Sequence, residues 1–303
     1  MAKVDILVLT YNQEKFVGKT LQSLIDQQCP SDFKIIINDD GSTDGTQKIL
    51  KEFAAAYPKI IDLQLNEKNL GIPGNFYNAA LRSNSDYICL CGGDDYWDDV
   101  HKLSNQVEIL DNNINIGMVY TDYSICDEDG NFLREVKVPQ VTFESLLSKN
   151  LIAAVTVCFK RTGFIKYLNE IKPEDKGWRM EDYPMWLWFA KNKLVFHLPH
   201  NTSVYRVGHE SITHNKDVNK KISFINSVAS IKKFYCDFYN YNNKKYIYEC
   251  ERYELLHIFL NDGDFQSYKK VCNSLILKNV KYLFFKLFSV NQLIFNCASR
   301  LLK

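Results

Sequence analysis

Three pairs of adjacent carboxylates stand out as residues that could do chemistry in this chain. They are Asp39 and Asp40, Asp94 and Asp95, and Glu181 and Asp182. Carboxylate oxygens are the ligands that Mg²⁺ and Mn²⁺ prefer. A carboxylate in apolar surroundings can also take a proton from a substrate, because burial raises its pKa. The three pairs therefore predict a cation site, a site for a polar ligand, or a general base.

The first pair lies in "INDDGSTDGT", directly after an apolar run. A structural interpretation is open, because Asp40–Gly41 favours a turn and the residues that follow can cap a helix. A cap needs one carboxylate, however, and this stretch has two in succession. The second interpretation is that Asp39 or Asp40 accepts the imide N–H of uracil or thymine, or a ribose hydroxyl.

The second pair lies in "GGDDYW". The two glycines allow the backbone to approach a ligand closely. Asp94 and Asp95 can bind Mg²⁺ or Mn²⁺, and such an ion would bind the diphosphate of a nucleotide and neutralise the leaving group. The alternative is a solvated acidic turn with Trp97 packed inward, which accounts for Asp98 and Asp99 better than for the pair itself.

The third pair lies in "WRMEDYPMW", among several aromatic residues. Acidic residues in the first turn of a helix are favoured by the helix dipole, so capping is the structural interpretation. The functional interpretation is a general base, because a carboxylate walled by indole rings can hold a raised pKa and deprotonate a sugar hydroxyl.

The order of patterns along the chain predicts how these residues are positioned. Continuous apolar strands are expected at 4–12, 33–39, 60–66 and 86–91, separated by stretches with helical spacing. This alternation predicts an α/β fold with a parallel sheet covered on both faces. In such sheets ligands bind outside the carboxyl ends of the strands. The second half is less regular, with a hairpin turn at Asp129–Gly130, and the pattern is helical from about Lys216 onward.

Composition excludes some classes of function. The 303 residues contain 37 Lys plus Arg and 36 Asp plus Glu, so net charge gives no reason to expect a nucleic-acid partner. The nine cysteines are odd in number and scattered, and "AKVDILVLTYN" after Met1 is not an export signal, so we expect reduced thiols in a cytosolic protein. No apolar run reaches the roughly 18 residues of a membrane-spanning helix.

The end of the chain has an unusual charge pattern. After Asp264 there is no acidic residue, while lysines and arginines alternate with "YLFFKLF" and "LIF". A basic, aromatic-rich segment over 265–303 can lie on an anionic membrane surface, at the inner face of the cytoplasmic membrane. The alternatives are a packing helix with a solvated basic face, or contacts in a homodimer.

Several motifs together resemble a known family. "ILVLTYNQEKFVGKTLQSLIDQ", "IIINDDGSTDGT", "NLGIPGNFYNAAL", "DYICLCGGDDYW" and "MEDYPMW" occur in the order found in inverting glycosyltransferases of family 2, of the bacterial capsule and O-antigen type. The resemblance covers roughly residues 3–210. It implies a GT-A fold with a mostly parallel central sheet: a domain over 1–215, with a nucleotide half at about 1–100 and an acceptor half at about 101–215, followed by a helical extension over 216–303.

The resemblance also implies roles for individual residues. Those matching the family's nucleotide-binding positions are Thr10, Tyr11 and Asn12 in the pocket, Asp39 and Asp40 at base and ribose, and Asn69 and Gly71 beside the nucleotide. Asp94 matches the metal ligand, with Asp95 beside it. Asp182 matches the catalytic base, and Glu181 is expected to bind the acceptor. "YRVGHESITH" resembles a later family segment in which His209, or less well His214, would approach the metal or the diphosphate.

One position departs from the family pattern. Two residues before Asp94 the family usually has Asp or Glu, whereas this chain has Gly92. The missing carboxylate is expected to weaken contact with the metal or the ribose, unless Asp95 replaces it.

The resemblance implies that the protein transfers a sugar from a nucleotide-sugar, with inversion, to a hydroxyl of a lipid-linked glycan. A UDP-sugar is the first donor to expect, and Mn²⁺ or Mg²⁺ is the implied cofactor. Two alternatives stay open. A sugar nucleotidyltransferase would normally have a glycine-rich loop after its first strand, and here no glycine occurs before Gly18. A non-catalytic scaffold is favoured by Gly92 and disfavoured by Asp94 and Asp182.

Overall fold

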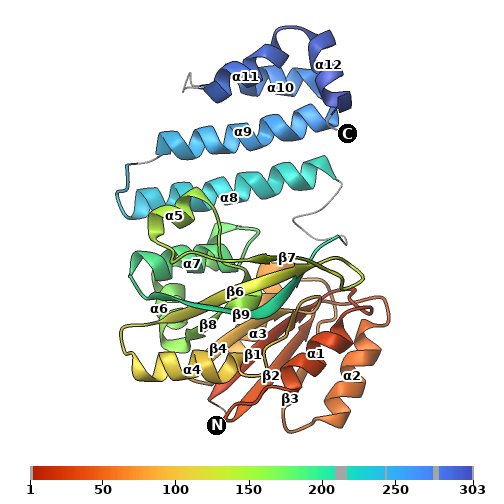
Figure 1. Ribbon diagram of the computed structural model, residues 1–303, viewed down its shortest axis with the longest axis vertical. Helices are drawn as coiled ribbons and strands as arrows, with labels where there is room; N and C mark the ends of the chain where they lie inside the picture. The colour runs from red at the N-terminus through yellow and green to blue at the C-terminus, as the bar shows by residue number, and fades with distance from the viewer. Residues whose placement is uncertain (1–2, 209–216, 243, 276–279, 302–303) are drawn as a thin grey trace. The chain divides into compact units, whose positions relative to one another are not determined.

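The computed structural model describes residues 3–208, 217–242, 244–275 and 280–301 (Figure 1). The chain forms two compact units, residues 1–208 and 209–303. The predicted first domain extends to residue 215, and this boundary stays a prediction because 209–216 lie outside the described ranges.

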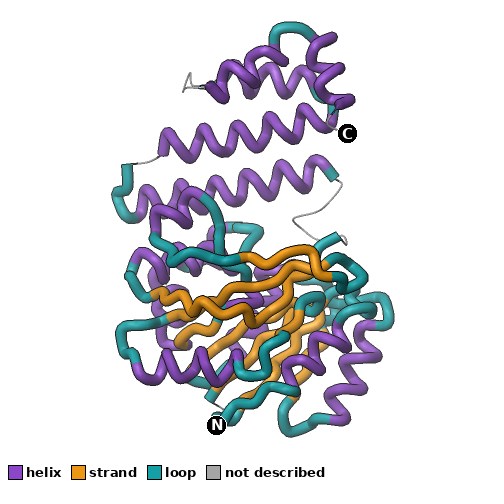
Figure 2. The backbone as a smooth tube through the Cα atoms, viewed as in Figure 1, coloured by secondary structure: helices purple, strands orange, loops and turns teal. Residues whose placement is uncertain are grey.

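The first half of unit 1 alternates strands and helices as the apolar pattern predicts. Its elements are β1 Val4–Thr10, α1 Val17–Ile25, β2 Phe33–Asp39, α2 Thr46–Ala56, β3 Ile61–Leu65, α3 Gly71–Arg82 and β4 Tyr87–Gly92. These four strands run parallel in the order β3-β2-β1-β4 (Figure 1). Figure 2 shows the strands of unit 1 in orange, with helices in purple beside them. Because the strands are parallel, their carboxyl ends, with the acidic residues that follow them, meet at one edge.

The second half of unit 1 extends the sheet with mixed pairing. Its elements are β5 Tyr96–Trp97, α4 Lys102–Asn112, β6 Met118–Cys126, β7 Phe132–Val136, α5 Phe143–Ser148, β8 Cys158–Lys160, α6 Arg161–Ile171, α7 Asp182–Lys191 and β9 Val195–Arg206, with short 3-10 turns at Ala154–Thr156 and Pro173–Lys176. The order continues β4-β8-β6-β9-β5, with β7 beside β6. The short strand β8 is antiparallel to β4 and to β6, whereas β6 and β9 are parallel. The sheet is therefore parallel over its first four strands and mixed beyond them.

The core of unit 1 lies on both faces of this sheet. Alternate residues of β1, such as Val4 and Ile6, are fully buried in one cluster with Leu21 of α1, Leu50 of α2 and Val107 of α4. Figure 1 shows these three helices along the sheet. Helix α3 instead contacts β1 and β2, as the period-2 alternation of a strand covered on both faces requires.

Unit 2 is entirely helical in its described part. It contains α8 Val218–Phe238, α9 Lys244–Asp262, α10 Phe265–Asn273, α11 Val280–Ser289 and α12 Gln292–Leu301. A separate apolar cluster, which includes Leu256, Tyr268 and Phe295, joins α9 to the last three helices. The helical extension expected from the sequence is thus a packed unit with its own core.

Candidate active site

The carboxyl ends of β1, β2 and β4 are tied together by short hydrogen bonds. The Thr10 hydroxyl donates to Asp39 Oδ1 at 3.0 Å. Beyond the end of β4, the Gly93 amide donates to the Leu9 carbonyl at 3.0 Å. The predicted parallel sheet is confirmed over these strands, and this arrangement brings their carboxyl ends to one edge.

Asp39 is fully buried, and protein groups occupy both of its oxygens. Oδ1 accepts the hydroxyls of Thr10 and Ser42, and Oδ2 accepts the Ser42 amide at 2.9 Å and Gln47 Nε2 at 2.8 Å. A carboxylate offers about four lone-pair directions, and these four donors use them. The geometry therefore favours a structural role for Asp39, holding the loop after β2 against β1, over the predicted contact with base or ribose.

Asp40, which follows β2, has a different environment because it contacts the start of α3. Its Oδ1 accepts the Leu70 amide at 2.7 Å and Asn66 Nδ2 at 3.3 Å, and its Oδ2 accepts the Gly71 amide at 3.0 Å. The Asn69 side chain also accepts the Gly71 amide, at 2.9 Å. Asp40 is buried as well, and its three donors use three of its four lone-pair directions. Its negative charge stabilises the N-terminal end of α3.

The residues after β1 form a sharp corner above this edge. Asn12 has a left-handed backbone (φ 52°), a conformation that asparagine tolerates better than most residues. Its amide donates to the Ser42 hydroxyl at 2.9 Å, and its side-chain oxygen accepts the Thr43 amide at 2.8 Å. Tyr11 at the corner is 49% exposed, so its ring is available to stack on a flat ligand group.

The loop after β4 has no room for a side chain at its two glycines. A Cβ on Gly92 would lie 2.6 Å from Asp94 Oδ1, and a Cβ on Gly93 would lie 2.7 Å from Thr10 Cγ2. The carboxylate of Asp94 thus occupies the space beside position 92, where the family pattern usually has an acidic residue. The departure at Gly92 permits this conformation of Asp94.

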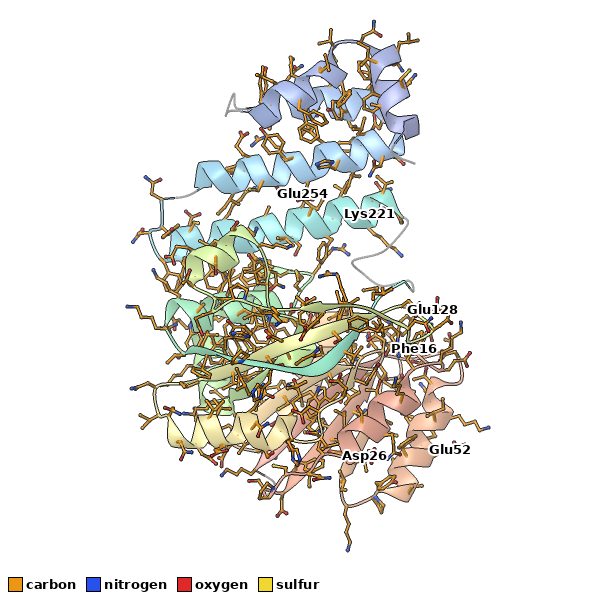
Figure 3. All side chains as sticks on the ribbon, viewed as in Figure 1. Phe16, Asp26, Glu52, Glu128, Lys221 and Glu254 are labelled. Atoms are coloured by element: carbon orange, nitrogen blue, oxygen red, sulfur yellow. The ribbon has the colours of Figure 1, made fainter. Side chains whose placement is uncertain are left out.

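Asp95 is buried and linked to the end of β9. Its Oδ1 accepts the Arg206 amide at 2.9 Å, and Arg206 Nε donates to the Asp94 carbonyl at 3.0 Å. Burial, and next the charge of Asp94, raise the pKa of Asp95 well above its ordinary value. The Arg206 guanidinium lies over the Phe16 ring, and the two residues line a cavity of about 300 Å³ with Glu128. Figure 3 labels Phe16 and Glu128, which lie close to each other. Sequence reasoning missed Arg206, although it stands in the "YRVGHESITH" segment.

The predicted cation site would have to be formed by these side chains. Within the described ranges, no group of three or more His, Cys, Asp or Glu residues has the geometry of a metal site. A Mg²⁺ or Mn²⁺ ion commonly uses one or two protein carboxylates together with waters and substrate phosphates. Asp94 fits such a shared site, whereas the buried Asp95 is engaged by Arg206. His209 and His214 lie outside the described residues.

Glu181 and Asp182 form the start of α7, where burial affects both carboxyl groups. Burial, and next the charge of Asp182, raise the pKa of Glu181 to about 8. Burial also raises the pKa of Asp182, to about 6, although the Tyr183 amide donates to Asp182 Oδ1 at 2.6 Å. The indole N–H of Trp186 lowers the pKa of Asp182, while Nε1 has no partner in hydrogen-bonding geometry within the described part of the chain. A carboxylate with a pKa near 6 suits a general base.

Tyr77 connects this acidic pair to the rest of the site. The charges of Glu181 and Asp182 contribute to raising its pKa, after burial as the largest cause. Tyr77 stands six residues after Gly71 in α3, about 9 Å along the helix axis. The N-terminal end of helix α3 therefore lies against Asp40, and Tyr77, further along the helix, lies within electrostatic range of the acidic pair. The sequence signal for Tyr77 was weak, because "NFYNAAL" reads as an ordinary amphipathic helix.

Sequence comparisons agree with the arrangement of these motifs. Residues 5–172 match the profile described as Glycosyl transferase family 2. A Mycobacterium tuberculosis protein without assigned function is 32% identical over 164 residues, which are 52% of this chain and 47% of that protein. The Escherichia coli UDP-Glc:alpha-D-GlcNAc-diphosphoundecaprenol beta-1,3-glucosyltransferase WfgD is 26% identical over 70% of this chain and 80% of its own. The chain thus spans about half the length of the mycobacterial relative.

Solved structures share the fold. Staphylococcus aureus TarS 1-349 in complex with UDP superposes with a TM-score of 0.61 at 15% identity, covering 98% of this chain and 90% of its own. The mannosyltransferase PcManGT of Pyrobaculum calidifontis, in complex with GDP-Man and Mn²⁺, gives 0.57 at 16% identity, with 98% and 86% covered. These likenesses confirm the expected GT-A fold.

Proposed function

Because the chain belongs to glycosyl transferase family 2, we propose that it transfers a sugar from a nucleotide-sugar to a glycan hydroxyl with inversion. The observation that carries the proposal is the acidic pair at the start of α7, where burial raises the pKa of Asp182 to about 6. At neutral pH such a group is mostly ionised yet basic enough to accept a proton. Helix α3 links this pair to Asp40 at the strand ends.

The chemistry that follows is a single displacement. Asp182 takes the proton of the acceptor hydroxyl, the hydroxyl oxygen forms a bond to C1 of the sugar, and the bond from C1 to the nucleoside diphosphate breaks. Glu181, with a pKa of about 8, is mostly protonated at neutral pH and can donate a hydrogen bond to the acceptor. One base on the face opposite the leaving group is sufficient for inversion.

The donor is held by the strand ends in this proposal. The exposed Tyr11 ring stacks on the base, and the remaining lone pair of Asp40 accepts an N–H from it. Thr10, Asn12, Asn69 and Gly71 shape the pocket. Asp94, with His209 as the proposed second contact, would hold Mg²⁺ or Mn²⁺, which neutralises charge on the departing diphosphate.

The finer identities of donor and acceptor are proposed by analogy. The name of the Escherichia coli relative contains UDP-Glc and a diphosphoundecaprenol acceptor, which supports a UDP-sugar and a lipid-linked glycan here. Such an acceptor would place the protein at the inner face of the cytoplasmic membrane. A homodimer through unit 2 is a further prediction from the sequence.

The decisive experiment compares Asp182→Asn with the parent protein. Transfer from a panel of nucleotide-sugars should fall by at least 10²-fold, because the amide cannot accept the proton. Nucleotide binding in the presence of Mn²⁺ should be retained. The exposed neighbour Asp175, changed to Asn, is the matched control and should keep parental activity.

Other outcomes would identify a different function. Parental turnover by Asp182→Asn would overturn the base assignment. Release of pyrophosphate instead of a nucleoside diphosphate would indicate a nucleotidyltransferase. Nucleotide binding without turnover of any donor, in the presence of glycan acceptors, would indicate a non-catalytic scaffold.

A further inference from the structure

Two helices of unit 2 leave a row of large apolar side chains in contact with solvent. In α11 they are Leu283, Phe284 and Leu287, which are 56–66% exposed, and in α12 they are Leu293 and Ile294, which are 73% and 41% exposed. Val290, between the helices, is 68% exposed. We call these six residues the apolar face. Isolated exposed apolar residues are common, but a group of this size marks an interaction surface.

The residues that α11 and α12 bury in the core of unit 2 determine that the apolar face is exposed to solvent. Phe285 of α11 and Phe295 of α12 lie in the cluster that forms the core of the unit, at 4% and 0% exposure. The hydroxyl of Tyr268, on α10, donates to the Phe285 carbonyl at 2.8 Å. Each helix therefore already buries one apolar side, so the exposed residues form a second apolar side that the core of unit 2 does not use.

The segment of the sequence that contains the apolar face is basic. No acidic residue follows Asp264 in the sequence, while seven lysines and arginines do. Lys269 and Lys270, on α10, are exposed. A second copy of this chain would bring two basic surfaces together, which costs free energy, whereas an anionic lipid surface is complementary to them.

We propose that the apolar face inserts into the interface of a membrane that contains anionic lipids, with the basic residues of the same segment at the phosphate level. Helical side chains at i, i+1 and i+4 share one side of a helix, and Leu283, Phe284 and Leu287 have this spacing. Apolar insertion combined with basic contacts is the pattern of helices that lie on a membrane. Within the described residues no helix is both long and apolar enough to cross a bilayer, and interfacial binding does not need one.

The test is flotation of the full-length protein with vesicles of phosphatidylcholine alone or mixed with phosphatidylglycerol. The parent should bind the mixed vesicles, and added salt should weaken binding. The double variant Phe284→Ser/Leu293→Ser should bind at least 10-fold less. Ile114→Ser is the matched control, because Ile114 is 90% exposed but belongs to unit 1, and it should bind as the parent does.

A charge variant and two further readouts complete the test. Lys269→Glu/Lys270→Glu should reduce binding to mixed vesicles, which checks the basic contribution without altering an apolar residue. Light scattering should give the same mass for the parent and the double variant.

The proposal would be overturned if the parent and the double variant floated equally. It would also be overturned if the parent did not float with the mixed vesicles at all. A parent dimer that becomes monomeric in the double variant would assign the face to a second copy. Hydrolysis of a soluble nucleotide-sugar reports on the transferase proposal separately and should be unchanged.

Discussion

At the scale of single residues, the site depends on how its carboxylates are distributed between structure and chemistry. Asp39 and Asp95 are buried and accept hydrogen bonds from protein donors, whereas our proposal gives metal binding to Asp94 and proton transfer to Asp182. In this proposal adjacent acidic residues have different roles because their neighbours differ. Two predictions test this division.

The first concerns the pH dependence of transfer. Because the base must be ionised, activity should fall as pH drops through about 6, and it should fall again above about 8, where Glu181 loses the proton that it donates to the acceptor. The two carboxyl groups titrate as a pair, so the measured value belongs to both. Trp186→Phe removes the N–H that favours ionised Asp182, so the acid limb should move upward. The measurement is the pH profile of kcat/KM.

Trp188→Phe is the control for this prediction. It makes the same change in volume in the same helix, but the Trp188 indole donates to Glu170 at 2.9 Å instead of facing the acidic pair. Its acid limb should match that of the parent. An unshifted limb in Trp186→Phe would contradict the assignment.

The second prediction concerns the close approach at Gly92. Gly92→Ala places a Cβ where Asp94 Oδ1 now lies, so the carboxylate must move. We expect Mn²⁺-dependent activity to fall by about 10-fold, as when a group that orients a metal ligand is lost. Gly18→Ala, in α1, is the control, because its Cβ would meet no atom within 4 Å. Parental activity of Gly92→Ala across a Mn²⁺ titration would remove Asp94 from the metal site.

At the scale of elements, α3 connects the proposed donor site with the proposed base. Its first amides bind Asp40, and Tyr77 in its next turns lies beside the acidic pair. A displacement of the N-terminal end of α3 would therefore also move Tyr77, because a helix moves as a rigid element.

The third prediction tests this connection. Asp40→Asn removes the charge at the start of α3 and one acceptor of its amides, so the protein should lose about 1–2 kcal/mol of unfolding free energy. Binding of a uridine nucleotide should weaken as well. Chemical denaturation and calorimetric titration give the two values. Asp26→Asn, at the exposed end of α1, should change stability by less than about 0.5 kcal/mol. Equal stability of Asp40→Asn and Asp26→Asn would argue against the anchor.

At the scale of the whole molecule, the chain has two cores with separate functions in our proposals. Unit 1 contains all described site residues, and unit 2 contains the apolar face. Separate cores permit separate unfolding, which leads to the fourth prediction.

Differential scanning calorimetry of the full chain should show two transitions. Mn²⁺ with a nucleoside diphosphate should raise the midpoint of one transition, because a ligand stabilises only the unit that binds it. The Phe284→Ser/Leu293→Ser variant should leave that ligand-dependent shift unchanged. One cooperative transition that shifts as a whole would mean that the two units unfold together.

Local pattern was sufficient to predict much of this protein. The apolar run of β2 was predicted with the bounds that the structure gives, and the alternation of strands and helices led to the parallel half of the sheet. These features depend on residues near one another in the chain. The family, confirmed by the match over 5–172, also follows from short motifs in order.

Only the tertiary structure decided how the carboxylates divide their roles and where the apolar face lies. The four donors to Asp39 come from residues 10, 42 and 47, and the amide that binds Asp95 comes from Arg206, 111 positions away. The antiparallel insertion of β8 and the outward side of α11 likewise depend on what packs against them. A pKa or an exposed fraction is set by neighbours in space, and a sequence motif does not specify those neighbours when they come from distant parts of the chain.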